Sequence, residues 1–161
     1  MNEQLYLTEE EAKNLREELA ELTGPRRAEL AIRLKEAKAM GDLSENADWH
    51  KAKEDQGFLE GRIQEVEYIL NKSLVITDRE AKSRLDTVHV GNTVQIVITM
   101  DGVVDDPEEY KIVGVEGANV AERKISNESP LGRALMGHRV GQVVTVQSQN
   151  GEYTAKILKI T

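Results

Sequence analysis

The sequence predicts an α+β protein in which a long antiparallel α-helical coiled-coil hairpin precedes a small β-rich domain. Up to about residue 73, apolar residues recur at three- and four-residue steps, which is the period of a helix. Beyond that point they alternate with polar residues, which is the period of a strand. The length of 161 residues allows one ordinary domain or two small ones, and the change of period favours two. We therefore expect the hairpin over residues 1–75 and a globular domain over residues 76–161.

The first helix has a clear start and an interruption. Thr8 and Glu11 have the spacing of a capping box. Pro25 lacks an amide proton, so we expect the helix to break or bend there without changing direction, with Thr23 or Gly24 near the cap of a restarted helix. The apolar stripe on both sides of this interruption consists of Ala12, Leu15, Leu19, Leu22, Leu30, Leu34 and Ala37.

The second helix is expected over residues 47–73 and has a heptad-like apolar seam, which is typical of a coiled coil. The seam consists of Ala52, Leu59, Ile63, Val66 and Leu70, with Gln56 at one further position. Residues 41–45 form a short connection, and short connections join antiparallel neighbours. An arm of about 30 residues would reach roughly 45 Å and expose its tip.

The C-terminal half reads as strands separated by glycine-containing turns. Alternating or β-branched runs lie at residues 94–98, 110–115, 144–146 and 153–157. Asn150 followed by Gly151 is typical of a hairpin turn between two strands. Residues 129–136 are expected to form a short helix with Pro130 near its start.

Composition excludes several classes of protein. The chain has no cysteine, so disulfides and cysteine-held metals are excluded. A net charge of −8 argues against a protein that holds nucleic acid mainly through its phosphates. If nucleic acid is involved, we expect a protein partner to supply most of the contact. His50, His89 and His138 are scattered and have no metal-ligand spacing. No signal peptide or membrane span is visible, so we expect a cytoplasmic monomer without membrane contact.

Two acidic residues, Asp42 and Glu45, fall at the predicted tip of the hairpin, and their spacing has two interpretations. Two exposed carboxylates can supply part of a Mg²⁺ site that a partner completes. The same spacing is that of a capping box for the second helix. The substitution Asp42→Asn separates the two interpretations, because a cap needs an acceptor whereas a metal ligand needs negative charge.

The tip and second helix resemble the GreA/GreB family of bacterial transcript-cleavage factors. The resemblance rests on residues 41–47, 50, 52–54, 56–58 and 60–63, and it continues in Arg26 and Arg27 on the first helix. It extends to residues 110–114 and 125–132 in the second half. It therefore covers nearly the whole chain and preserves the order of both halves.

The resemblance implies a protein that is no enzyme by itself and binds no cofactor alone. Factors of this family insert their coiled coil through the secondary channel of bacterial RNA polymerase. Asp42 and Glu45 would there help to hold a Mg²⁺ ion shared with the polymerase, whose own active site hydrolyses the 3′ end of a backtracked nascent RNA. The resemblance also implies that the C-terminal domain is FKBP-like and docks at the outer rim of the channel.

Further residue roles are carried over from the same resemblance. The turn would be shaped by Gly41, Leu43, Ser44 and Asn46. RNA or polymerase would be contacted by Lys38, Lys53 and Trp49, whose alternative roles are a solvated helix face for the lysines and packing on the first helix for the tryptophan. Polymerase docking is assigned to Ser129, Pro130, Leu131 and Gly132, of which the middle two could equally be structural.

This chain departs from the family pattern in a few places. Lysine stands where the family usually has arginine near the tip, and Trp49 stands where tyrosine is common. Proline usually follows the paired arginines, whereas Pro25 precedes them. The modest basic surface favours GreA-like behaviour over GreB-like. The alternative function is a regulator that occupies the channel and inhibits polymerase without promoting cleavage. An autonomous prolyl isomerase is disfavoured by the 4% aromatic content, and an autonomous nuclease by the incomplete set of metal ligands.

Overall fold

The computed structural model describes residues 4–161 and confirms the α+β class. It divides into two compact units. One is the helical arm, Lys13–Lys72, and the other combines the residues up to Ala12 with Ser73–Thr161. The expected division between residues 75 and 76 therefore differs from the observed one. The cause is a pairing that the period of the sequence does not reveal: strand β1 (Tyr6–Thr8) lies parallel to strand β2 (Leu74–Ile76), which ties the chain's first strand to the globular unit.

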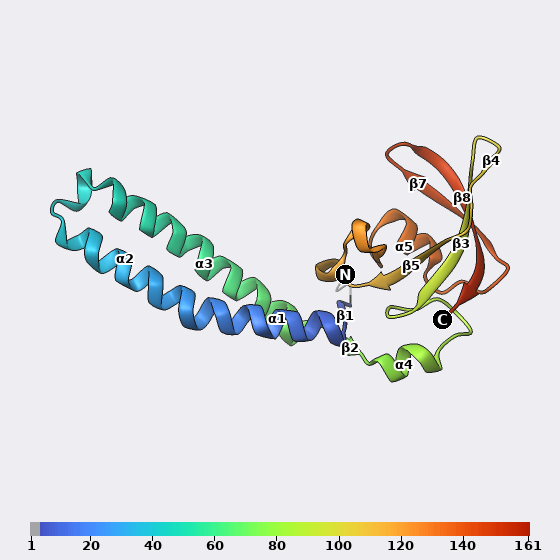
Figure 1. Ribbon diagram of the computed structural model, residues 1–161, viewed down its shortest axis with the longest axis horizontal. Coiled ribbons are helices and arrows are strands. Elements are labelled where there is room, and N and C mark those ends of the chain that lie inside the picture. Colours follow the sequence, from blue (N-terminus) through green and yellow to red (C-terminus); the bar gives the residue numbers. More distant parts are fainter. Residues whose placement is uncertain (1–3) are drawn as a thin grey trace. The chain divides into compact units, whose positions relative to one another are not determined.

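The first helix of the arm passes through its proline without a break. Helix α1 (Glu9–Glu21) continues through a π-helical segment (Leu22–Arg26) into α2 (Arg27–Ala39), and both keep one direction (Figure 1). The predicted restart with a new cap is wrong, whereas the predicted direction is confirmed. The hydroxyl of Thr23 donates to the carbonyl of Leu19 at 2.7 Å. The wider turn of a π segment accommodates a residue that has no N–H to donate.

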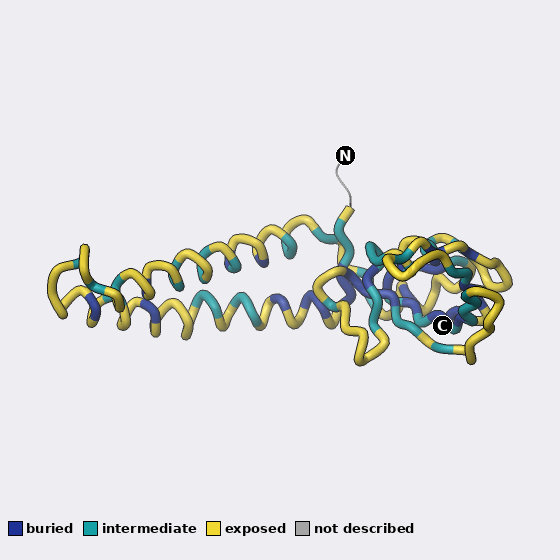
Figure 2. The backbone as a smooth tube through the Cα atoms, turned by 90° about the horizontal axis from the view of Figure 1, so that it is seen from above, coloured by how far each residue is buried: buried dark blue, intermediate teal, exposed yellow. Residues whose placement is uncertain are grey.

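Helix α3 (Ala47–Lys72) returns antiparallel to α2, as predicted. The seam between the two sides of the arm is narrow, and most of the arm's surface is exposed (Figure 2). The buried seam residues are Leu15, Leu30, Ala37, Ala52, Ile63 and Val66. Ion pairs between the two sides flank the seam, namely Arg62 with Glu18, Arg27 with Glu60, and Arg33 with Asp55. The apolar seam sets which faces meet, and the charged pairs favour one register.

The globular unit is built on a six-stranded sheet with the order β6-β5-β3-β8-β7, to which β4 adds on β3. The strands are β3 (Thr93–Met100), β4 (Val103–Val104), β5 (Glu108–Val113), β6 (Lys124–Ser126), β7 (Val143–Ser148) and β8 (Gly151–Ile160). The β3, β5, β7 and β8 strands confirm the four predicted runs. The predicted hairpin at Asn150 and Gly151 joins β7 to β8, with Gly151 at a φ of 115°.

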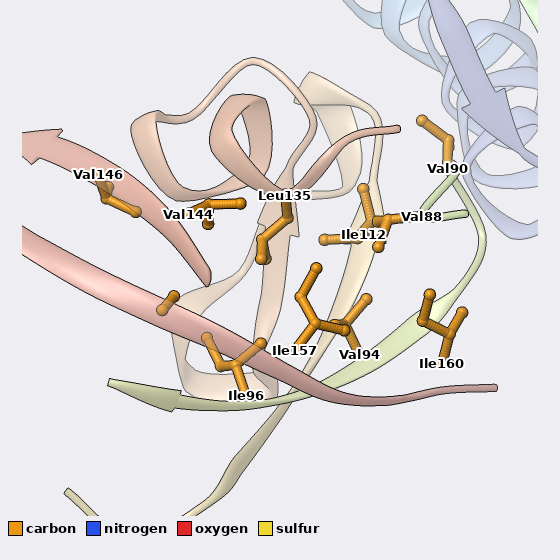
Figure 3. Close-up of a cluster of buried hydrophobic side chains, with 11 residues drawn as sticks. Val88, Val90, Val94, Ile96, Ile112, Leu135, Val144, Val146, Ile157 and Ile160 are labelled. Atoms are coloured by element: carbon orange, nitrogen blue, oxygen red, sulfur yellow. The ribbon is translucent and has the colours of Figure 1, made fainter. Parts of the chain in front are cut away.

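Two short helices accompany the sheet. Helix α4 (Asp78–Ser83) begins with a capping box between Thr77 and Glu80. Helix α5 (Pro130–Leu135) begins at Pro130 as predicted and covers one face of the sheet. Figure 3 shows Leu135 of α5 among the buried side chains of the sheet. The core consists of Val88, Val90, Val94, Ile96, Ile112, Leu135, Val144, Val146, Ala155, Ile157 and Ile160.

Candidate functional site at the tip of the helical arm

The tip of the arm is a tight turn that begins at Asp42. Gly41 has a φ of 127°, a conformation that favours glycine, and a 3₁₀ turn (Leu43–Glu45) follows. One carboxylate oxygen of Asp42, Oδ1, accepts from the backbone N–H of Ser44 at 3.0 Å and from its hydroxyl at 2.9 Å. Both bonds lower the pKa of the Asp42 carboxyl below its usual value, and the bond from the backbone N–H of Ser44 has the larger effect. Asp42 is therefore ionised at neutral pH.

Asn46 is the N-cap of the second helix, and this bears on whether Asp42 and Glu45 form its capping box. The side-chain oxygen of Asn46 accepts from the backbone N–H of Trp49 at 3.0 Å. Its amide nitrogen donates to the carbonyl of Ala37 at 2.6 Å and so joins the end of α2 to the start of α3. Asp42 caps the 3₁₀ turn instead. The interpretation of Asp42 and Glu45 as the capping box of the second helix is therefore wrong.

Glu45 is exposed, and within residues 4–161 its carboxylate has no hydrogen-bond or ion-pair partner. The Oδ2 atom of Asp42 is likewise unbonded in the described part of the chain. Both carboxylates thus present unbonded oxygen atoms to solvent, which is the donor type that Mg²⁺ prefers. The set is incomplete, because no group of three or more His, Cys, Asp or Glu side chains that could hold a metal exists among the described residues.

The remaining tip residues differ in their exposure and in the contacts of their side chains. Leu43 is half-buried, whereas Ser44 is exposed and its carbonyl lies 3.3 Å from a ring nitrogen of His50. Trp49 is half-buried, with the ammonium of Lys53 at 5.2 Å from its ring centroid. Lys53 also donates to Gln56 at 3.2 Å.

Lys38 is exposed near the end of α2 and has no side-chain partner among the residues that the structure describes. It is therefore the tip lysine whose charge is available without breaking an existing contact. The resemblance brought Lys38, Lys53 and Trp49 together only as candidates. The structure brings Lys53 and Trp49 into contact, one turn apart on α3, and places Lys38 on the other helix.

Comparison with known proteins covers both units. The sequence-family model of the transcription elongation factor N-terminal domain matches residues 5–75. The family model of the GreA/GreB C-terminal domain matches residues 82–161. Transcription elongation factor GreA of Caldanaerobacter subterraneus subsp. tengcongensis is 42% identical, with 99% of each chain covered. The chain belongs to the GreA/GreB family of transcription elongation factors.

Another GreA sequence and a solved structure are also similar to this chain, at different degrees of identity. Transcription elongation factor GreA of Thermoanaerobacter pseudethanolicus is 43% identical, again with 99% of each chain covered. Among solved structures, GreA factor homolog 1 of Thermus thermophilus is 25% identical, covers 99% of each chain and gives a TM-score of 0.43.

The residues that the family resemblance assigned to docking have visible structural roles in the globular unit. The hydroxyl of Ser129 donates to the carbonyl of Ser126 at 2.7 Å and accepts from the N–H of Gly132, which caps α5. Gly132 is buried, and a Cβ there would overlap the carbonyl of Ser126. Leu131 is half-buried against the core, so Pro130 presents the most exposed side chain of the four.

Sequence reasoning missed the role of Asn46 as cap of the second helix. The signal was present, because asparagine is a preferred cap and Asp48 follows in the first turn. No helix in the described part of the chain is long and apolar enough to cross a membrane.

Proposed function

We propose that this protein is a transcription elongation factor that stimulates RNA polymerase to cleave backtracked nascent RNA, by carrying Asp42 and Glu45 through the secondary channel to the polymerase active site. The observation that supports this most directly is that neither carboxylate is needed to start α3, since Asn46 does so. Two ionisable groups remain at the exposed end of a long arm with unbonded oxygen atoms.

The chemistry follows from what the two carboxylates can hold. Asp42 Oδ2 and the two oxygens of Glu45 would supply part of the coordination of a Mg²⁺ ion, and the polymerase and the RNA phosphate would supply the rest. Such an ion lowers the pKa of a bound water and stabilises the charge that develops on the scissile phosphate. The hydroxyl and N–H of Ser44 keep the Asp42 carboxylate ionised and fix its orientation. The cleavage itself belongs to the polymerase, so the protein acts as a donor of ligands.

The residues around the carboxylates have supporting roles in this proposal. Lys38 has an unengaged ammonium group that would contact an RNA phosphate or an acidic group of the polymerase. Lys53 is already held between Trp49 and Gln56, so it would add positive charge close to the tip from a fixed position. Pro130 and Leu131 would contribute to docking of the globular unit.

The test is a cleavage assay on RNA polymerase stalled in a backtracked complex with labelled RNA and Mg²⁺. We expect the unmodified protein to shorten the RNA. Asp42→Asn and Glu45→Gln should each abolish cleavage while retaining polymerase binding. Asn at position 42 can still accept from Ser44, so the turn is preserved while the charge is lost.

Asp48→Asn is the matched control, because Asp48 is an exposed acid in the first turn of α3 next to the tip. The Asp48→Asn variant should stimulate cleavage by the polymerase as much as the unmodified protein does. If Asp42→Asn and Glu45→Gln both stimulate cleavage normally, the proposed role of the two carboxylates is wrong. If the unmodified protein binds polymerase and cleaves nothing, the protein is instead a regulator that occupies the channel.

A further inference from the structure

The turn that carries the two tip acids has few restraints of its own. It connects α2 to α3 at the end of the arm (Figure 1) and begins after Gly41, whose φ is 127° and where even an added Cβ would meet no atom within 4 Å. Inside the turn, the N–H of Asn46 donates to the carbonyl of Leu43 at 3.4 Å, which is long for a hydrogen bond. The turn therefore needs support from outside itself to keep one conformation.

Glu45 depends on that support more than Asp42 does. The Oδ1 atom of Asp42 accepts two hydrogen bonds from Ser44, which hold its side chain against the turn. The carboxylate of Glu45 has no hydrogen-bond or ion-pair partner within residues 4–161. The place of the Glu45 carboxylate is thus set by the backbone from which its side chain extends.

The side chain of His50, in the first turn of α3, supplies support for this backbone. Its Nε2 atom lies 3.3 Å from the carbonyl oxygen of Ser44. Because a carbonyl oxygen can only accept, the ring nitrogen is the donor. The backbone of His50 is itself fixed, since its N–H donates to the carbonyl of Asn46 at 3.1 Å. In the part of the chain that the structure describes, no other side chain of α3 has a hydrogen bond to residues 43–45.

The hydrogen bond from His50 reaches Glu45 through the peptide plane. The carbonyl of Ser44 and the Cα of Glu45 belong to one planar peptide unit, so fixing the direction of this carbonyl also restrains that Cα. Ser44 therefore joins the two acids. Its N–H and hydroxyl orient Asp42, and its carbonyl, held by His50, sets the backbone of Glu45.

A direct role of His50 as a metal ligand is disfavoured by the geometry. No group of three or more His, Cys, Asp or Glu side chains among the described residues could hold a metal ion. The ring of His50 therefore does not converge with Asp42 and Glu45 on one ion, although all three are exposed at the same tip. Its Nε2 atom contacts the turn instead.

We propose that His50 is a positioning residue for stimulated RNA cleavage, which holds the Ser44 carbonyl so that Glu45 is presented beside Asp42 in one fixed arrangement. This rests on the proposed function for the use that the polymerase makes of the two carboxylates. His50 touches neither RNA nor the Mg²⁺ ion in this account, and its effect is on the geometry of the donated ligands.

The first test measures cleavage of backtracked RNA by RNA polymerase over a range of concentrations of this protein. We expect His50→Ala to lower the cleavage rate at saturation about tenfold, the effect of one lost hydrogen bond, with an unchanged concentration for half-maximal stimulation. His50→Gln should restore most of the rate, because the amide nitrogen of glutamine can donate from nearly the place of Nε2.

Lys51→Ala is the matched control, because Lys51 is the next exposed residue of α3 and its ion pairs with Glu54 and Asp55 stay within that helix. This control should stimulate cleavage normally. A normal rate for His50→Ala would overturn the proposal. A raised half-maximal concentration with a normal rate at saturation would show a contact with the polymerase or the RNA instead. Failure of His50→Gln to restore the rate would show that the ring acts otherwise than by donating to the turn.

A second measurement uses the free protein and needs no polymerase. The ¹⁵N order parameter of the Glu45 amide should fall in His50→Ala from about 0.85, typical of a rigid backbone, toward the flexible range below about 0.6. It should stay near the unmodified value in His50→Gln and Lys51→Ala. Equal order parameters in all four proteins would overturn the proposal. If Asp42→Asn and Glu45→Gln leave cleavage unchanged, the proposed function fails, whereas the order parameter still decides whether His50 holds the turn.

Discussion

The carboxylate of Glu11 accepts a hydrogen bond from the backbone N–H of Gly117 at 2.7 Å, across 106 residues of sequence. It also accepts from Gly114 at 3.1 Å and from Thr8 at 2.6 Å. The Thr8–Glu11 capping box predicted from the sequence is thus confirmed, and Glu11 additionally joins the first turn of α1 to the turn that follows β5. Glu11 is buried, with 5% of its surface exposed, and these backbone amides compensate its burial.

Replacing Glu11 by alanine should destabilise the protein by about 3 kcal/mol, because the N–H groups of Gly114 and Gly117 lose their shared acceptor in a buried place. Urea unfolding followed by circular dichroism measures this. Glu10→Gln is the control, because Glu10 is exposed and its contact with Lys124 is 3.8 Å long. It should change the free energy of unfolding by less than about 0.5 kcal/mol.

Alanine at position 117 should have an effect similar to the loss of Glu11. A Cβ on Gly117 would overlap the Glu11 carboxylate, so the hydrogen bonds must lengthen or break. The prediction is a lower urea midpoint for Gly117→Ala and little further loss when Glu11→Ala is added. Additive losses in the double variant would show that the two residues act independently.

Asn46 holds both helices at the tip, and its two bonds can be separated by substitution. Asn46→Asp keeps an acceptor for the N–H of Trp49 but loses the donor to Ala37, whereas Asn46→Ala loses both bonds. We expect Asn46→Ala to cost about 1 kcal/mol and Asn46→Asp less. Hydrogen exchange at the Trp49 amide should be faster in Asn46→Ala and nearly unchanged in Asn46→Asp. Equal exchange in both would mean that the cap does not hold the start of α3.

The bidentate pair between Arg27 and Glu60, with N–O distances of 2.8 and 2.7 Å, should contribute to the register of the arm. Arg27→Glu should lower the melting temperature, and the exchange of both residues, Arg27→Glu with Glu60→Arg, should restore most of it. Because the pair is exposed, the difference should shrink at high salt. Failure of the exchange to restore stability would show that the loss came from packing of the arginine stem.

Tyr110 should ionise late in an alkaline titration. Its partial burial and its hydrogen bond to the carboxylate of Glu108 raise the pKa of the phenol to about 12. Since the folded pKa lies above the unfolded value of about 10, the contribution of Tyr110 to stability is fully present below pH 10 and is lost as pH rises toward 12. Tyrosinate absorbance should show a late component that Tyr110→Phe reduces, and the remainder belongs to Tyr153, whose pKa is raised by burial. A titration of all tyrosines near pH 10 would contradict this.

The sequence predicted the parts of the fold that depend on neighbouring residues. The three- and four-residue steps of the arm, the Thr8 and Glu11 cap, the strands and the start of α5 all depend on residues close in the chain, and the structure confirms them. The π segment was missed because proline interrupts the helical pattern in the sequence whether the helix breaks or only widens.

At the tip, too, residues that are close in the chain did not suffice to predict the hydrogen bonds. Asp42 and Glu45 were identified as its exposed acids, but their spacing fitted a cap as well as a metal ligand. Whether the cap interpretation holds depends on which residue caps the second helix, and Asn46 does so while it also donates to Ala37, nine residues earlier and on the opposite helix. That bond forms only once the two helices lie side by side.

The sequence by itself determined the helical and strand periods of the two halves, the acidic tip and the family. Each of these depends on residues that are neighbours along the chain or on the order of motifs. Only the tertiary structure decided that β1 pairs with β2, that the Glu11 carboxylate accepts from Gly114 and Gly117, and that β7 is the last strand of its sheet. Those features join residues far apart in sequence, and pairing over such distances depends on how the whole core packs.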